Sequence, residues 1–212
     1  MSETINTRRR NLILGGSAGL LSLPCYANKL FTPRQSAGPF YPDLPMLDDD
    51  NDLTQISGKK GIAKGRIAEL YGKVIDINGN PLSGVVVEIW QCDFNGRYRH
   101  SEDDQSRPME SNFQGFGRNI TDDLGRYRFR TIRPVAYPGR TPHIHAAVFR
   151  DGMRPFVTQI YVEGEAQNSE DFLFQRIPSI LRPMVVADFR PTDNGIVELV
   201  ANFDFVLMDG VG

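Results

Sequence analysis

The chain has 212 residues, of which 40% are hydrophobic and 24% charged, a composition typical of one globular domain. Its formal net charge is −2, so it lacks the surplus of cations with which proteins bind nucleic-acid phosphates, and neither DNA nor RNA is expected as a partner. Two cysteines are too few for a disulfide framework. Of these, Cys92 is predicted to be a buried structural thiol.

The first thirty residues have the features of an export signal. Arg8–Arg10 precede an apolar stretch from Leu12 to Leu23, and small residues follow around Ala27. The stretch is shorter than the ~20 residues of a membrane-spanning helix, so no stable membrane span is expected. The arginines resemble a twin-arginine signal, which predicts that residues 1–30 are removed and that the protein is exported to the periplasm or the cell exterior. The alternatives are an untargeted basic tail and lipid attachment at Cys25.

Residues 31–212 are predicted to form one domain that begins with an irregular arm. Thr32–Asp52 is rich in proline, glycine and aspartate and has no apolar period, so this arm is expected to lie over the domain without regular structure. The acidic run 48–52 is interpreted as a solvated loop, because the acidic residues of a calcium loop are spaced rather than contiguous.

The rest of the chain is predicted to be mostly β, an antiparallel β-sandwich with long irregular connections and minor short helices. Alternating or β-branched segments indicate six strands: Ile67–Ile75, Val85–Gln91, Tyr127–Ile132, His143–Phe149, Phe156–Val162 and Ile196–Leu207. The stretch from Ser169 to Asp188 is the candidate helical region, and Pro178 and Pro183 divide it into short pieces.

Two of the three histidines, His143 and His145, form a His-x-His pair inside a predicted strand. Alternate residues of a strand point to the same face, so both imidazoles can reach one metal ion while Ile144 packs on the other side. A metal-free surface or core pair is the competing interpretation. His100 is expected beside the site or at the surface, and Trp90 in the core or in a pocket wall.

Two tyrosines lie in glycine-containing loops earlier in the sequence than the histidine pair. Tyr137 precedes His143 in YPGRTPHIH, and Tyr98 lies in NGRYRH. Two imidazoles with phenolic oxygens favour a hard trivalent ion, which can remove the phenolic proton despite a free pKa of about 10. Iron(III) is therefore the predicted metal.

The sequence resembles a known family, the intradiol ring-cleavage dioxygenases, and most closely its protocatechuate 3,4-dioxygenase branch. Several motifs carry the resemblance in the family's order: TPRQSAGPFYP (32–42), LYGKVIDINGNPLSGVVVEIWQCDFNGRYRH (70–100), TDDLGRYRFRTIRPVAYPGRTPHIH (121–145) and TQIYVEGE (158–165). The implied activity is cleavage of a catechol-type ring between its hydroxylated carbons with both atoms of O2, which gives a cis,cis-muconate-type diacid.

The resemblance also implies roles for individual residues. Four protein ligands of a ferric ion, Fe(3+), are implied: Tyr98, Tyr137, His143 and His145. Tyr137 is the one that leaves the metal when the catechol binds. Arg140 matches an arginine beside the substrate ring and Gln159 its polar neighbour, so these two and Tyr137 are the catalytic candidates.

The sequence leaves other points open. The substrate is a catechol of unspecified type, and the chain could form a homo-oligomer, pair with a different chain, or act alone. GKVIDINGNPLSGVVVEIW also resembles the strand pattern of transthyretin-like and carboxypeptidase-regulatory modules, which favours a non-enzymatic extracellular binding module as the alternative. A zinc hydrolase at His143 and His145 would need a third histidine or a carboxylate, and none is suitably spaced.

Overall fold

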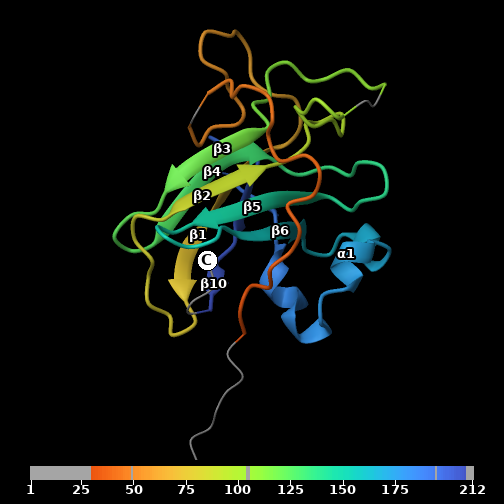
Figure 1. Ribbon diagram of the computed structural model, residues 1–212. Helices are drawn as coiled ribbons and strands as arrows, with labels where there is room; N and C mark the ends of the chain where they lie inside the picture. The colour runs from red at the N-terminus through yellow and green to blue at the C-terminus, as the bar shows by residue number, and fades with distance from the viewer. Residues whose placement is uncertain (1–29, 49, 104–105, 194, 209–212) are drawn as a thin grey trace, which may run out of the picture.

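The computed structural model describes residues 30–48, 50–103, 106–193 and 195–208. The predicted signal peptide, residues 1–30, lies outside these residues except for its last position. In the described part of the chain, two five-stranded sheets pack face to face around an apolar interior (Figure 1). This confirms the prediction of a mostly β sandwich with long connections and short helices.

The first sheet is built around β1 (Ile67–Asp76). One neighbour is β4 (Arg126–Ile132), which pairs antiparallel with it, whereas β9 (Leu199–Asn202) and β10 (Phe205–Leu207) both pair parallel. The short β8 (Arg190–Pro191) adds to β9. The predicted strand over 196–207 is thus two strands, and the sheet is mixed rather than purely antiparallel.

The second sheet carries the predicted histidine pair. Its strands follow the order β3 (Phe116–Ile120), β2 (Val86–Trp90), β5 (His143–Phe149), β6 (Phe156–Val162) and β7 (Val186–Ala187). All pairings are antiparallel except that of β6 with β7.

The strand β3 was not predicted, because its sequence FGRNI has no alternation of apolar and polar residues. Its Gly117 packs so closely against the chain leading into the domain that an added Cβ would lie 2.5 Å from Leu53 Cδ1 and 3.1 Å from Asp50 O. Gly117 thus weakens the strand pattern in the sequence, and its lack of a side chain also allows this close contact.

The two faces of β5 serve different purposes. Ile144, Ala146 and Val148 belong to the main core between the sheets. Ala147, on the same face as the histidines, joins a second apolar cluster on the outer side of the sheet with Trp90, Cys92, Tyr98 and Phe116. Cys92 is 1% exposed, which confirms its predicted burial, and burial raises the pKa of its thiol to about 12.

The arm over 32–52 contains no helix or strand in its described residues, as predicted, and it lies along the outer side of β6. Gln35 N donates a hydrogen bond to Val157 O over 2.9 Å, and Gln35 Nε2 donates to Thr158 Oγ1 over 3.1 Å. Figure 1 shows this arm in red and orange, passing in front of the second sheet. It covers the face that carries the histidines.

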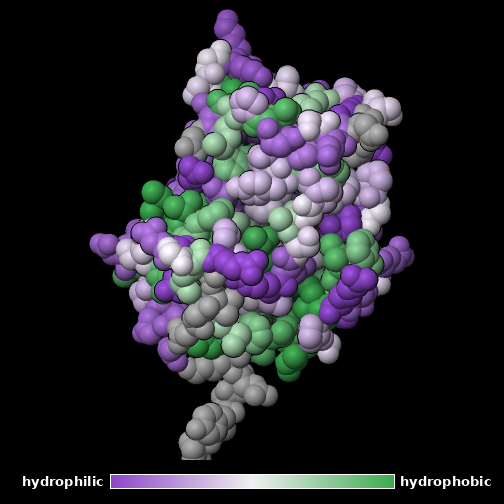
Figure 2. All heavy atoms as spheres, in the orientation of Figure 1, coloured by the Kyte–Doolittle hydropathy of each residue, from purple (hydrophilic) through white to green (hydrophobic). Residues whose placement is uncertain are grey.

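Short helical segments follow β6: the 3₁₀-helix η1 (Ala166–Ser169), the α-helix α1 (Phe172–Gln175) and the 3₁₀-helix η2 (Ser179–Val185). They confirm the prediction of broken helical pieces over 169–188. Within the described ranges no helix is long and apolar enough to cross a bilayer. On the face in Figure 2, hydrophilic and hydrophobic residues are interspersed.

Candidate metal centre

The register of the second sheet brings the predicted site residues onto one face. His145 lies opposite Trp90 on β2 and opposite Gln159 on β6, while His143 lies opposite Tyr161. Directly opposed residues of antiparallel strands share a face. Trp90 stacks on His145 with ring centroids 5.0 Å apart and 7° between the planes. Of the two places predicted for Trp90, the core or a pocket wall, the structure shows the wall of the site.

Both imidazoles are buried and converge on one point. His143 Nδ1 lies 2.6 Å from Thr141 O, and the Nε2 atoms of His143 and His145 are 3.1 Å apart. Because a carbonyl only accepts, Nδ1 of His143 carries the proton and its Nε2 presents a lone pair. Burial lowers the pKa of His143 to about 3 and holds the pKa of His145 well below its usual value. Neutral imidazole is the form that binds metals.

The two tyrosines complete a closed circuit of rings with the histidines. Successive centroid distances are 5.3 Å from Tyr98 to Tyr137, 5.5 Å from Tyr137 to His143, 4.7 Å from His143 to His145 and 6.0 Å from His145 to Tyr98. The structure therefore brings together all four predicted ligands, from a loop, a turn and one strand.

The phenol of Tyr98 is buried and poorly paired. Its ring is 2% exposed, its Oη makes no hydrogen bond of ordinary geometry with the described residues, and the neighbouring Tyr137 phenol is at most a weak partner. Burial raises its pKa well above the ordinary value, because a phenolate has no water to solvate it there. A buried polar atom without a partner is costly, and a cation at this position would satisfy it.

The geometry of the histidines fits a bound metal ion. Two imidazole nitrogens about 2.1 Å from one metal and at right angles to each other are roughly 3 Å apart, close to the Nε2–Nε2 distance found here. No set of three His, Cys, Asp or Glu side chains in the described part of the chain is placed to bind a metal. The donor set at this point is instead two imidazoles and two phenols, as predicted for iron(III).

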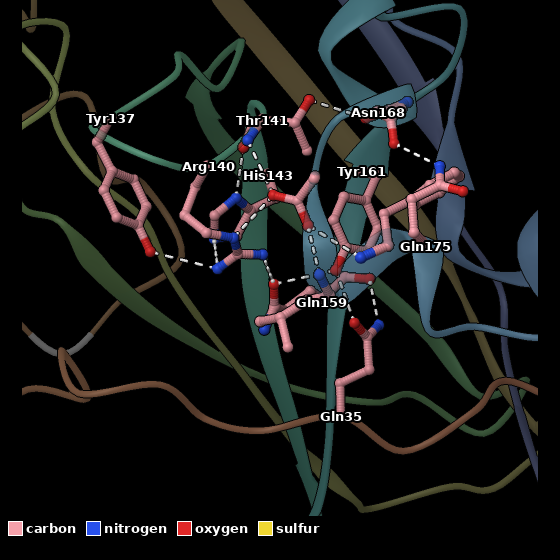
Figure 3. Close-up of polar contacts among 12 residues, drawn as sticks. Gln35, Tyr137, Arg140, Thr141, His143, Gln159, Tyr161, Asn168 and Gln175 are labelled. Atoms are coloured by element: carbon pink, nitrogen blue, oxygen red, sulfur yellow. Dashed lines mark hydrogen bonds and ion pairs between the residues drawn. The ribbon is translucent and has the colours of Figure 1, made fainter.

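Arg140 lies between the ligand rings and β6, as Figure 3 shows. Its Nη1 is 3.3 Å from Tyr137 Oη and 3.4 Å from His143 Nε2, and its Nη2 donates to Gln159 Oε1 over 2.6 Å. The structure thus places Arg140 beside Tyr137, and Gln159 beside Arg140. The guanidinium thus brings a positive charge within 3.4 Å of atoms of two predicted ligands.

A cavity of about 430 Å³ opens beside this arginine, and its wall includes Tyr137, Arg140, Thr141 and Asp171. Its size is within the usual range for small-molecule sites. Because Tyr137 is half-buried and lines this cavity while Tyr98 is enclosed, Tyr137 is the tyrosine that an entering molecule can reach.

Residues of the arm adjoin the site, although none of them was predicted individually. Phe40 stacks on Tyr98 with centroids 4.8 Å apart. Gly38, at φ +70°, lies so close to His145 that an added Cβ would be 3.2 Å from its Cε1. Gln35 Oε1 accepts from the Tyr161 hydroxyl over 2.7 Å. The sequence could have indicated these three residues, since all of them belong to the motif TPRQSAGPFYP.

Two further residues near Arg140 were missed. Tyr161 lies two positions after Gln159, so strand alternation would have placed it on the same face. Asp171 precedes the apolar run that forms α1 and accepts from Arg140 Nε over 2.8 Å. His100, by contrast, stays outside the ring of ligands: it is 8% exposed, and its Nδ1 accepts from the backbone N–H of Glu102.

Comparisons with known proteins agree with this geometry. A family model described as Dioxygenase matches residues 37–209. The chain is 35% identical to the protocatechuate 3,4-dioxygenase beta chain of Burkholderia cepacia, over 88% of this chain and 90% of that protein. It is 30% identical to catechol 1,2-dioxygenase of Candida albicans over 80% of this chain, although the match spans only 58% of that relative.

A solved structure shows the same arrangement of elements. The dioxygenase domain of a dioxygenase carbohydrate-binding protein fusion from Streptomyces sp. SirexAA-E matches with a TM-score of 0.65 and 29% identity, over 86% of this chain and 99% of that one. These similarities favour the enzyme over the transthyretin-like binding module.

Proposed function

The chain belongs to the intradiol ring-cleavage dioxygenases, a family of oxidoreductases, and we propose that it uses a ferric ion and O2 to cleave a catechol-type ring between its two hydroxylated carbons. The observation that carries the proposal is the closed circuit of Tyr98, Tyr137, His143 and His145, with the two Nε2 atoms 3.1 Å apart. The product would be a cis,cis-muconate-type diacid.

The donor set suits this ion. A ferric ion bound there would supply a Lewis-acid centre that acidifies the catechol hydroxyls and makes the ring reactive toward O2. His143 and His145 would bind through Nε2, since Thr141 O fixes the proton of His143 on Nδ1. Burial keeps both imidazoles neutral, and Trp90 and Phe40 exclude water from the closed side of the site.

Tyr137 is proposed as the base for the substrate. Burial raises the pKa of its phenol, while the Arg140 cation acts in the opposite direction. As a phenolate at the wall of the cavity, its Oη would accept a proton from a catechol hydroxyl, so no separate base is required.

Arg140 is proposed to stabilise negative charge on the ring. Its guanidinium remains charged throughout the reaction, and Gln159 and Tyr137 hold two of its nitrogens by hydrogen bonds. A fixed cation of this kind stabilises charge that develops in the transition state without reorganising.

A panel of catechols tests the proposal. The purified protein is expected to contain one iron per chain, to show the red colour of tyrosinate-to-iron(III) charge transfer, and to consume one O2 per catechol cleaved. The panel would include catechol, hydroxyquinol and protocatechuate. A colourless protein with full iron content, or one that consumes no O2 with any catechol, would contradict the proposed function.

We further propose that residues 1–30 direct export by the twin-arginine route, because a protein that folds around its metal before export requires a route for folded chains. Replacing Arg9 and Arg10 with lysine is expected to leave the protein in the cytoplasm of a bacterial host. Fractionation of cells that produce either version would measure this. Equal export of the two versions would exclude the route.

A further inference from the structure

We propose that Asp171 is a positioning residue of this site, which orients the guanidinium of Arg140 toward Tyr137 and His143 and acts on the reaction through it. The inference rests on the proposed function and adds to it a residue with no direct contact to the predicted metal ligands. The carboxylate of Asp171 is buried and accepts four hydrogen bonds.

Both oxygens of Asp171 are fully used. Oδ2 accepts from Arg140 Nε over 2.8 Å and from Thr141 N over 3.0 Å, and Oδ1 accepts from Leu173 N and Phe174 N over 3.0 and 2.9 Å. The side chain is 0% exposed. Although burial alone would raise its pKa, hydrogen bonds from Arg140 and the backbone hold the pKa of Asp171 below its usual value. The group is therefore a fixed anion.

These bonds determine where the remaining guanidinium nitrogens point. The guanidinium is planar, so when Nε is bonded to Asp171 and Nη2 to Gln159 Oε1, the direction of Nη1 is set. Nη1 then lies 3.3 Å from Tyr137 Oη and 3.4 Å from His143 Nε2. Without Asp171, one of the two anchors that prevent rotation of Arg140 would be lost.

Asp171 also joins two segments that are far apart in the sequence. It caps the N-terminus of α1 and at the same time bonds Arg140 and Thr141, just before β5 (Figure 3 shows the neighbouring contacts of Thr141 and Asn168). The side chains of Arg140 and Asp171 are 8% and 0% exposed, so this ion pair is largely buried although both residues line the cavity.

Asn168 offers a matched comparison. It lies in the same segment, is 8% exposed, and accepts from Thr141 Oγ1 over 2.8 Å while its Nδ2 donates to Val162 O over 2.8 Å. Among the described residues, none of its side-chain hydrogen bonds goes to Arg140. Loss of Asn168 would loosen the same loop without releasing the guanidinium directly.

The first test separates turnover from binding. Asp171→Asn keeps the size and the capping ability of the side chain but removes the charge and one acceptor. We expect kcat to fall roughly 10- to 100-fold, and the Kd for catechol, measured without O2 by the change in colour, to stay within about threefold. Asn168→Ala is expected to lower Tm with kcat within about threefold of the parent. Equal losses of kcat in the two variants would overturn the proposal.

A second variant covers the case in which Asp171→Asn folds poorly. Asp171→Ser retains a side chain that caps α1 but is too short to reach Arg140. It is expected to reproduce the loss of kcat, with a lower melting temperature because the buried Arg140 loses its anionic partner. If Asp171→Ser restored the parental kcat, the carboxylate would have only a capping role.

A double-mutant cycle tests whether Asp171 acts through Arg140. In an Arg140→Gln background, Asp171→Asn is expected to lower kcat by less than about twofold, since its target is already absent. An undiminished loss in that background would show that Asp171 acts by another route.

One readout does not depend on activity. In protein loaded with gallium(III), a diamagnetic trivalent ion, the Arg140 Nε–H resonance is expected to exchange slowly with water, and at least tenfold faster in Asp171→Asn but not in Asn168→Ala. If the parent fails to cleave any catechol but shows this pattern, the proposed function fails and the orientation of Arg140 by Asp171 stands. An unchanged exchange rate in Asp171→Asn would overturn the positioning role even in an active enzyme.

Discussion

The indole of Trp90 lies parallel to the imidazole of His145, with 5.0 Å between the ring centroids and 7° between the ring planes. The two residues face each other across β2 and β5, so the sheet register itself creates the stack. His143 has a carbonyl partner for its Nδ1, whereas Nδ1 of His145 makes no hydrogen bond with the described residues. Packing against Trp90 therefore holds His145 in place.

Replacing Trp90 with alanine is expected to lower stability by about 3–5 kcal/mol through the cavity it leaves, and to reduce iron content because His145 is free to rotate. Trp90→Phe keeps an aromatic face against the imidazole and is expected to retain most of the iron. Chemical denaturation and metal analysis of both variants would measure this. Full iron content in Trp90→Ala would contradict the role of the stack.

Tyr98→Phe should have opposite effects on stability and on metal binding. Removing a buried hydroxyl that makes no well-formed hydrogen bond with the described residues relieves a cost of about 1–3 kcal/mol, so the metal-free variant is expected to be at least as stable as the parent. Iron affinity and the red colour should both be reduced. A metal-free variant that is clearly less stable than the parent would show that the phenol has a structural partner.

Gly38→Ala is expected to disturb His145, and Gly152→Ala serves as its control. Both glycines have positive φ, +70° and +72°, so alanine costs about 1–2 kcal/mol of backbone strain at either position. Only at Gly38 would the new Cβ meet the imidazole, 3.2 Å from Cε1. Lower iron affinity is therefore expected in Gly38→Ala alone, measured by competition with a chelator. Similar affinities in the two variants would argue against contact between the arm and the ligand.

Cys92 is expected to be unreactive in the folded protein. Burial raises its pKa to about 12, so at pH 8 only roughly one thiol in ten thousand is ionised, and reagents require the thiolate. In a Cys25→Ser variant, iodoacetamide at pH 8 should modify Cys92 only after unfolding by denaturant. Rapid modification of the native protein, detected by mass spectrometry, would contradict the buried thiol.

The sequence predicted the strands that carry the site, because their alternation depends on one buried face. It also predicted that the imidazoles of His143 and His145 share a side, which follows from the geometry of any strand. The sequence did not predict strand direction. The parallel pairing of β1 with β9 and β10 joins residues more than a hundred positions apart, and a local hydrophobic period does not encode such pairing.

For the site, the sequence revealed the groups expected to bind the metal but not those that hold them. Tyr98 and Tyr137 were recognised because they stand in the motifs that carry the family resemblance. Asp171 was missed because its partner Arg140 lies thirty-one positions earlier and is reached only through the folded chain. The roles of the ligands and of Arg140 and Gln159 remain predictions, while their proximity is established.

The position of β1 constrains how the molecule is made. Its neighbours β9 and β10 lie between Leu199 and Leu207, so the first sheet cannot close until these residues have left the ribosome. Contacts of such long range slow folding, because a large loop must be closed before they form. Nascent chains would therefore remain open to chaperones until this segment has emerged, and loss of the last dozen described residues would prevent closure of a sheet that begins at Ile67.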